Sequence, residues 1–155
     1  MLKTIKRKLD PEPDAVSLLT ADHRAVEGLF QEFEQASNKR TQASIVKRIC
    51  FELDAHTKVE EKILYPAIKK EVKDLQDLVN ESFVEHAAVK RLVRELSSLP
   101  ASDEFFKAKV TVMKEFVQHH VKEEESDLFP KIVESGLDLK ELGERIARMK
   151  EKLGA

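Results

Sequence analysis

Apolar residues recur along this chain with the period of an α-helix. Between breaks rich in proline, glycine or small polar residues, they return every three or four positions, as on a helix with one face toward a core. The pattern predicts four long helices at about 14–37, 40–71, 74–98 and 103–134, and a shorter one at about 138–153. Because short breaks join helices of similar length, we predict an all-α fold, an antiparallel up-down-up-down four-helix bundle.

Short flanking helices are predicted at both ends of this bundle. Residues 1–13 form a basic amphipathic segment, residues 14–134 the bundle, and residues 135–155 a C-terminal helix that covers one flank. The N-terminal segment could bind a membrane or a partner through its basic face, or dock on the body of the domain. Docking is favoured because so short a segment buries little area.

Composition narrows the classes of function. The 155 residues suit one domain, and 36% of them are charged, against about a quarter in an average protein. The net charge of −2 lacks the basic excess of a nucleic-acid binder, so we expect no nucleic-acid partner. No stretch has the 18 or so apolar residues of a membrane span.

The single cysteine, Cys50, excludes a disulfide framework and a cysteine-rich metal site within this sequence. Its neighbours Ile49 and Phe51 indicate a small buried hydrophobe rather than a redox sensor. The start of the sequence has no apolar core of a secretory signal. A cytoplasmic location is therefore the expectation.

The chain contains an internal repeat. Residues 55–68 align with residues 119–132, and seven of the fourteen positions are identical. Residues 22–26 and 85–89 repeat in the same way. The chain therefore resembles two helical hairpins related by a pseudo-twofold axis, and a site on that axis would receive matching ligands from both.

Each long helix places one histidine on its apolar face, and in two helices a glutamate follows four residues later on the same face. The six residues are His23, His56, Glu60, His86, His120 and Glu124. One such histidine alone is more often a satisfied core residue. Two carboxylates inside one bundle, however, need neutralisation, because an unpaired buried charge costs several kcal/mol. A metal provides it; the alternative is a metal-free network of His–Glu hydrogen bonds.

The donor types narrow the choice of metal. Imidazole nitrogen and carboxylate oxygen without thiolate disfavour structural zinc and copper(I), and too few oxygens converge for calcium. Six side chains with two carboxylates able to bridge suit two octahedral iron ions, or less well manganese. Ferritin-like di-iron proteins use Glu-x-x-His, whereas this chain has His-x-x-x-Glu.

These motifs resemble those of the hemerythrin-like (HHE) family over about residues 14–132. The matching residues are Asp22-His23, His56-Thr57-Lys58-Val59-Glu60-Glu61 with Tyr65-Pro66, Glu85-His86, and His120-Val121-Lys122-Glu123-Glu124-Glu125 with Phe129-Pro130. The resemblance implies an antiparallel four-helix bundle that holds an oxo- or hydroxo-bridged pair of non-haem irons. Members of the family carry or sense O₂, sense iron or redox state, or handle peroxide and nitric oxide.

The sequence departs from the oxygen carriers at Lys90, where they have a further histidine. Its repeat mate is Glu27. A Glu27–Lys90 salt bridge near the site is favoured over the alternative that Glu27 replaces the missing ligand. If His119 were the ligand, its spacing to Glu124 would match the carriers, but the repeat and the apolar face select His120. His119 is therefore expected beside the site or on the flank.

Three further residues are secondary candidates near the metal. Glu61 and Glu125 repeat in register and are expected behind the ligands or in solvent. Tyr65 either reaches the site with its hydroxyl or packs at a helix end.

Three functions follow from these patterns. The first is a di-iron protein that binds or senses O₂ or a related small ligand. The second is a di-iron enzyme with peroxide-consuming, catalase-like activity. The third is a metal-free helical interaction module.

Overall fold

A computed structural model describes residues 13–155, and in this range the chain is all-α, without a strand. Its elements are α2 (Ala15–Gln35), α3 (Lys39–Val59), η1 (Glu60–Leu64), α4 (Tyr65–Glu71), η2 (Lys73–Leu75), α5 (Gln76–Ser97), α6 (Phe106–Glu123), η3 (Glu124–Leu128), α7 (Phe129–Glu134) and α8 (Leu139–Leu153). The predicted N-terminal helix falls on residues outside this range, apart from Pro13.

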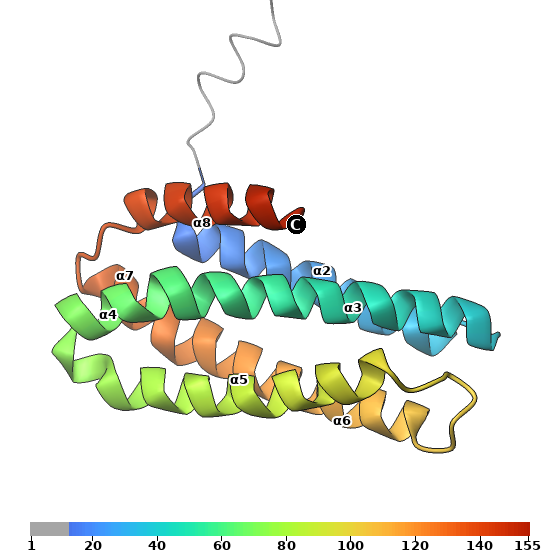
Figure 1. The fold of residues 1–155 in the computed structure, drawn as a ribbon. Coiled ribbons are helices and arrows are strands. Elements are labelled where there is room, and N and C mark those ends of the chain that lie inside the picture. Colours follow the sequence, from blue (N-terminus) through green and yellow to red (C-terminus); the bar gives the residue numbers. More distant parts are fainter. Residues whose placement is uncertain (1–12) are drawn as a thin grey trace, which may run out of the picture.

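Four long helical rods run antiparallel, as predicted: α2, then α3 with η1 and α4, then α5, then α6 with η3 and α7 (Figure 1). The shorter α8 lies along the outside of α2 and also contacts α3, which confirms the predicted C-terminal covering helix. The division of the chain into 1–13, 14–134 and 135–155 stays a prediction. Across residues 13–155, no helix combines the length and apolarity that crossing a bilayer requires.

Helix starts follow local capping. Asp138 caps α8, because its side chain accepts a hydrogen bond from the Glu141 N–H at 3.1 Å. The predicted start of the fourth long helix, near residue 103, is too early, because α6 begins at Phe106. Asp103 instead accepts from the Phe105 N–H at 2.8 Å and closes the turn before the helix.

Two long rods contain a π-helical turn that the apolar pattern did not predict. Pro66 and Pro130 have no N–H and crowd the carbonyl one turn back. The backbone widens before each proline: the Tyr65 N–H bonds the Glu60 carbonyl, five residues back, and η3 repeats the arrangement from Glu124. These π turns begin at the two glutamates of the candidate metal set, and π-bulges are frequent at functional sites.

The buried side chains form two apolar clusters with a polar layer between them. One cluster includes Val26, Leu53 and Val121. The other includes Leu19 and Val59. The candidate histidines fall between the clusters along each helix. The core therefore encloses the polar layer from above and below.

Gly143 marks the closest approach of α8 to the bundle. A Cβ atom there would lie 2.8 Å from the backbone of Asp14 and of Pro13. We expect Gly143→Ala to destabilise the fold by about 1–3 kcal/mol, because backbone atoms cannot rotate out of the way. Thermal unfolding followed by circular dichroism measures this, and the melting temperature should fall by roughly 3–10 °C.

Gly28 provides the matched control. It lies inside α2, and a Cβ atom there would meet no atom within 4 Å. Gly28→Ala should therefore leave stability unchanged or raise it by up to about 1 kcal/mol. An equal loss in both variants would contradict the close contact at Gly143.

Cys50 packs, partly buried, against the apolar cluster that contains Val26, in line with its predicted role as a small hydrophobe. Burial raises the pKa of its thiol to about 11. The thiolate is the reactive form, so alkylation at pH 8 should be at least about tenfold slower in the folded chain than in urea, and should speed up as the pH approaches 11. Iodoacetamide labelling followed by mass spectrometry measures both rates; equal rates would refute this burial.

Candidate metal centre

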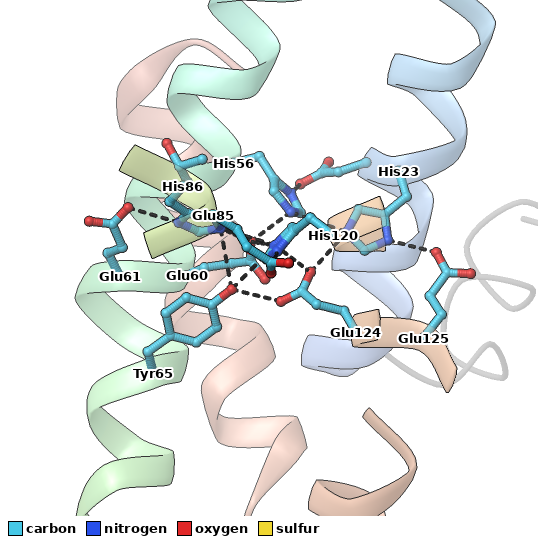
Figure 2. A network of polar contacts seen from close by, with 12 residues as sticks. His23, His56, Glu60, Glu61, Tyr65, Glu85, His86, His120, Glu124 and Glu125 are labelled. Atoms are coloured by element: carbon cyan, nitrogen blue, oxygen red, sulfur yellow. Dashed lines mark hydrogen bonds and ion pairs between the residues drawn. The ribbon is translucent and has the colours of Figure 1, made fainter. Parts of the chain in front are cut away.

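The four predicted histidines meet at mid-bundle, one each from α2, α3, α5 and α6 (Figure 2). His23 and His56 approach with 3.2 Å between their Nε2 atoms, and His86 and His120 with 3.1 Å. All four side chains are buried. The repeat therefore brings two pairs of imidazoles to one centre, as the pseudo-twofold axis predicts, with the rings of each pair tilted by 60° and 64°.

The two predicted glutamates lie between these pairs. Glu60 Oε1 is 2.9 Å from His56 Nε2 and 3.2 Å from His86 Nε2. Glu124 Oε1 is 3.2 Å from His23 Nε2 and 3.3 Å from His120 Nε2. Each carboxylate thus contacts one histidine of each pair, the position from which a carboxylate can bridge two ions.

A carboxylate backs each histidine on its outer side. Each Nδ1 atom lies close to one carboxylate. The pairs are His23 with Glu125 at 2.7 Å, His56 with Asp22 at 2.9 Å, His86 with Glu61 at 2.8 Å, and His120 with Glu85 at 2.8 Å. An ionised carboxylate only accepts hydrogen bonds, so Nδ1 donates and the Nε2 atom of each ring faces the centre. Such outer partners orient metal-binding histidines and raise their basicity.

Two of these outer carboxylates have lowered pKa values. Burial raises the pKa of Asp22, but the hydrogen bond from His56 and the ammonium group of Lys150 lower it overall. Burial likewise raises the pKa of Glu85, and its hydrogen bond with His120 contributes to a net decrease. Both groups are therefore ionised near neutral pH and accept the Nδ1 protons.

Fixed cations pair with three of the four outer carboxylates. Lys150 of α8 contacts Asp22, and Arg24 contacts Glu125. Lys90 Nζ lies 2.7 Å from Glu61. The predicted Glu27–Lys90 salt bridge is wrong.

Arg24, one turn before Glu27 on the same helix, holds the Glu27 carboxylate at 2.6 Å. The Glu27 side chain is 36% exposed. Glu27 also lies outside the clusters of potential metal ligands found among residues 13–155. The structure therefore does not place Glu27 where the ligand absent at Lys90 would be.

The centre collects more acceptors than donors. Neither oxygen of Glu60, nor Oε1 of Glu124, has a hydrogen-bond partner among the described residues. The contact of 2.9 Å between Glu60 and His56 is short enough for an ion pair but not aligned as a hydrogen bond. Buried polar atoms are rarely left unpaired, so a cation is the partner that this arrangement lacks.

The pKa values of three groups in the centre also indicate that it favours positive charge. Burial lowers the pKa of His56, but the Glu60 carboxylate and the bond to Asp22 raise it overall, to about 10. Burial also lowers the pKa of His120, and the Glu124 carboxylate leads the effects that bring it well above its usual value. Burial raises the pKa of Glu60, and the charge of His56 leads the effects that bring it well below the usual value. The Glu60 carboxylate thus stays ionised and attracts protons or metal ions.

Tyr65 breaks the pseudo-twofold symmetry. Its buried hydroxyl donates to Glu124 Oε2 at 2.7 Å and lies 3.3 Å from His86 Nε2 (Figure 2). Burial, followed by the charges of Glu60 and Glu124, raises its pKa well above the usual value, so it keeps its proton. Its repeat mate Phe129 stacks on His23, with 5.9 Å between ring centroids. Of the two alternatives for Tyr65, its hydroxyl reaches the site.

A small cavity of about 20 Å³ borders the four histidines. Val26, Leu53, Val89, Val117 and Val121 contribute its apolar lining. This volume exceeds the 10–15 Å³ or so that one water needs. The cavity can therefore hold one molecule of about the size of water beside the histidines.

The donor set fits metal ions. Two groups, His23/His56/Glu124 and Glu60/His86/His120, each bring three possible ligand atoms within 4.8 Å of one another. Within the groups, four His–Glu and His–His contacts measure 3.1–3.2 Å, about the separation of atoms that share an ion at 2.0–2.2 Å, and His120 lies 3.8 Å from Glu60. The side chains are thus already arranged for cations of this size.

Sequence reasoning did not assign roles to Asp22, Glu85 and Lys150. The first two precede His23 and His86 in the repeat, and this shared acidic position was the available signal. No sequence signal connects Lys150 with Asp22, because α8 lies outside the repeat. Glu61 and Glu125 are behind the ligands, as expected. His119 points to the flank, with 65% of its side chain exposed.

Comparison with known proteins places this geometry in a family context. The hemerythrin HHE cation binding domain matches residues 14–132. A crystal structure of an HHE cation binding domain-containing protein from Mycobacterium kansasii has a TM-score of 0.76 and 27% identity, covering 92% of this chain and 88% of that one. The family match from sequence and the structural match thus point to the same domain, the hemerythrin HHE cation binding domain.

Two curated relatives match part of their own length. A DNA nickase from Nostoc sp. is 31% identical over 117 residues, which are 74% of this chain and 32% of the relative. An uncharacterized hemerythrin-like protein from Schizosaccharomyces pombe is 26% identical over 110 residues, 70% of this chain and 54% of that protein. The chain therefore spans about a third and about half of these relatives.

Proposed function

The chain belongs to the family of hemerythrin HHE cation-binding domains, and we propose from this premise that its buried cluster holds two non-haem iron ions. His23, His56 and Glu124 would hold one ion, and His86, His120 and Glu60 the other. The observation that supports this most is the pair of unpartnered, fully buried oxygens of Glu60 between two imidazoles. Iron is favoured over manganese because imidazole is a better ligand for iron.

We further propose that the chain binds or senses O₂ or a related small ligand such as nitric oxide or peroxide, or reports iron or redox state. Iron in this position would supply reversible one-electron chemistry and affinity for such ligands. The chain's own contribution is the cavity beside the histidines, whose valine and leucine side chains exclude bulk water and admit only small molecules. The outer carboxylates hold the imidazole rings in place.

Filling the cavity tests this part of the proposal. The iron-loaded, reduced chain should change its visible spectrum when nitric oxide or O₂ is added. Val89→Phe, which places a ring in the cavity, should weaken that response at least about tenfold while the iron content stays the same. Val46→Phe, an equal enlargement in the core that does not line the cavity, should respond like the unmodified chain. An unchanged response in Val89→Phe would contradict this role for the cavity.

Tyr65 supports a second candidate, a catalase-like enzyme. Its hydroxyl, 2.7 Å from Glu124 and 3.3 Å from His86 Nε2, would be the proton donor for peroxide held at the centre. Oxygen evolution from peroxide by the iron-loaded chain tests this function. Tyr65→Phe should lower the rate by roughly 100-fold with the iron content unchanged; a rate no better than that of free iron would remove the enzyme candidate.

The partner and location expectations stay predictions. The DNA nickase from Nostoc sp. is matched over 32% of its own length, so its activity is not carried over to this chain. This chain has a net charge of −2 and offers little electrostatic attraction to DNA. We therefore still expect no nucleic-acid partner, and a cytoplasmic location.

A further inference from the structure

The outer carboxylates differ in one respect that the repeat does not explain. Asp22, Glu61 and Glu125 each pair with a lysine or arginine. Among the ion pairs of residues 13–155, Glu85 pairs only with histidines: Oε1 with His120 Nδ1 at 2.8 Å, and Oε2 with His119 Nε2 at 3.2 Å. Glu85 therefore lacks the fixed cation that its three counterparts have.

His119 and Glu123 complete a cluster around the outer oxygen of Glu85. Glu123 lies one helical turn after His119 on α6, and its Oε1 is 3.1 Å from His119 Nε2. One ligand atom from each of the three side chains lies within 4.8 Å of the others. This His-x-x-x-Glu pair is displaced by one residue from the buried His120–Glu124 pair and faces the surface instead.

The cluster has the dimensions of a metal site. Atoms bound to zinc at about 2.0–2.1 Å in a tetrahedron are roughly 3.3 Å apart, close to the 3.1 and 3.2 Å between His119 and the two glutamates. One imidazole and two carboxylates suit a borderline divalent ion such as Zn²⁺ or Fe²⁺. The His119 side chain is 65% exposed and that of Glu123 is 40% exposed, which leaves room for water as a further ligand.

We propose that His119, Glu85 and Glu123 form a surface site for a divalent transition-metal ion. The ion takes the place that Lys150, Lys90 and Arg24 occupy at the other three outer carboxylates. Glu85 connects this surface site to the buried centre, because its other oxygen accepts the Nδ1–H of His120. An ion on Glu85 draws electron density from that hydrogen bond and lowers the basicity of His120. This coupling, unlike the surface site itself, rests on the proposed function.

Zinc binding to the metal-loaded chain tests the site. The unmodified chain, loaded at the buried centre and desalted, should take up one further equivalent of Zn²⁺ in a competition titration with a chromophoric chelator. His119→Ala and Glu123→Gln should weaken this binding at least about tenfold. Gln118→Ala and Glu115→Gln, at exposed neighbouring positions of α6, should bind Zn²⁺ like the unmodified chain. Equal uptake with and without His119 would overturn the proposal and leave the cluster as an ion pair only.

Two further readouts separate this site from the buried one. In the metal-free chain, Zn²⁺ equivalents that depend on His119 can be counted apart from those that depend on Glu60, so the surface site can be tested even if the di-iron proposal fails. In the iron-loaded chain, saturating Zn²⁺ should shift the visible spectrum of the unmodified protein but not of His119→Ala. An identical spectrum with and without Zn²⁺ would overturn the coupling through Glu85.

Discussion

Removal of the metal is expected to lower the melting temperature of the chain by about 10 °C or more. Metal binds the folded bundle and not the unfolded chain, so its binding free energy adds to the stability of the fold. A site at 1,000 times its dissociation constant contributes about 4 kcal/mol. One kcal/mol shifts the midpoint of a domain of this size by roughly 2–4 °C.

Thermal unfolding before and after treatment with a chelator and dithionite measures this difference. Restoring Fe²⁺ without oxygen should restore the original midpoint, which separates metal loss from damage by the chelator. A midpoint that does not move on chelation would favour the metal-free network of histidines and glutamates, and with it a plain interaction module.

Replacement of Glu60 by glutamine is the second change with a large expected effect. The substitution keeps the shape of a fully buried side chain and removes its charge. We expect the affinity for metal to fall at least about 100-fold, because an amide oxygen is a weaker ligand than a carboxylate and bridges ions poorly. The melting temperature of Glu60→Gln should then no longer respond to chelator or to added iron.

The response to added metal separates two roles of this carboxylate. In the metal-free chain the Glu60 carboxylate pairs with His56, whose pKa it raises, so metal-free Glu60→Gln should be several kcal/mol less stable than the metal-free unmodified chain. If Glu60 is also a metal ligand, added Fe²⁺ should raise the melting temperature of the unmodified chain but not of Glu60→Gln; if Glu60 is only a structural partner of the histidines, Fe²⁺ should leave both melting temperatures unchanged or raise both equally. Glu134→Gln, at an exposed position near the end of α7, is the control and should retain the response to chelator.

Periodicity and repetition in the sequence predicted most of the architecture. The apolar period gave five of the helical segments to within a few residues, since each helix buries one face continuously. The histidines on those faces, together with the repeat of 55–68 in 119–132, led to the six residues that now surround one point. Such residues can be found from sequence because position on a helix face depends only on spacing.

Other features depend on contacts that spacing does not encode. The π turns at Glu60 and Glu124 arise because a proline six residues later removes a hydrogen-bond donor. The partner of Lys90 is Glu61 of another helix rather than Glu27. Lys150 reaches Asp22 from α8, a helix whose docking position follows from the three-dimensional packing around Gly143. Pairings between helices of this kind are set by packing geometry, which a pattern within one helix does not specify.

The iron content of the purified chain tests the central claim most directly. The protein is isolated from iron-replete cells without a metal-affinity step, and iron and zinc are measured by mass spectrometry against protein concentration from amino-acid analysis. We expect about two irons per chain in the unmodified protein and in Glu134→Gln, and fewer than about 0.2 in Glu60→Gln. An unmodified chain without iron, even after incubation with Fe²⁺ under exclusion of oxygen, or an iron content that Glu60→Gln leaves unchanged, would contradict the account.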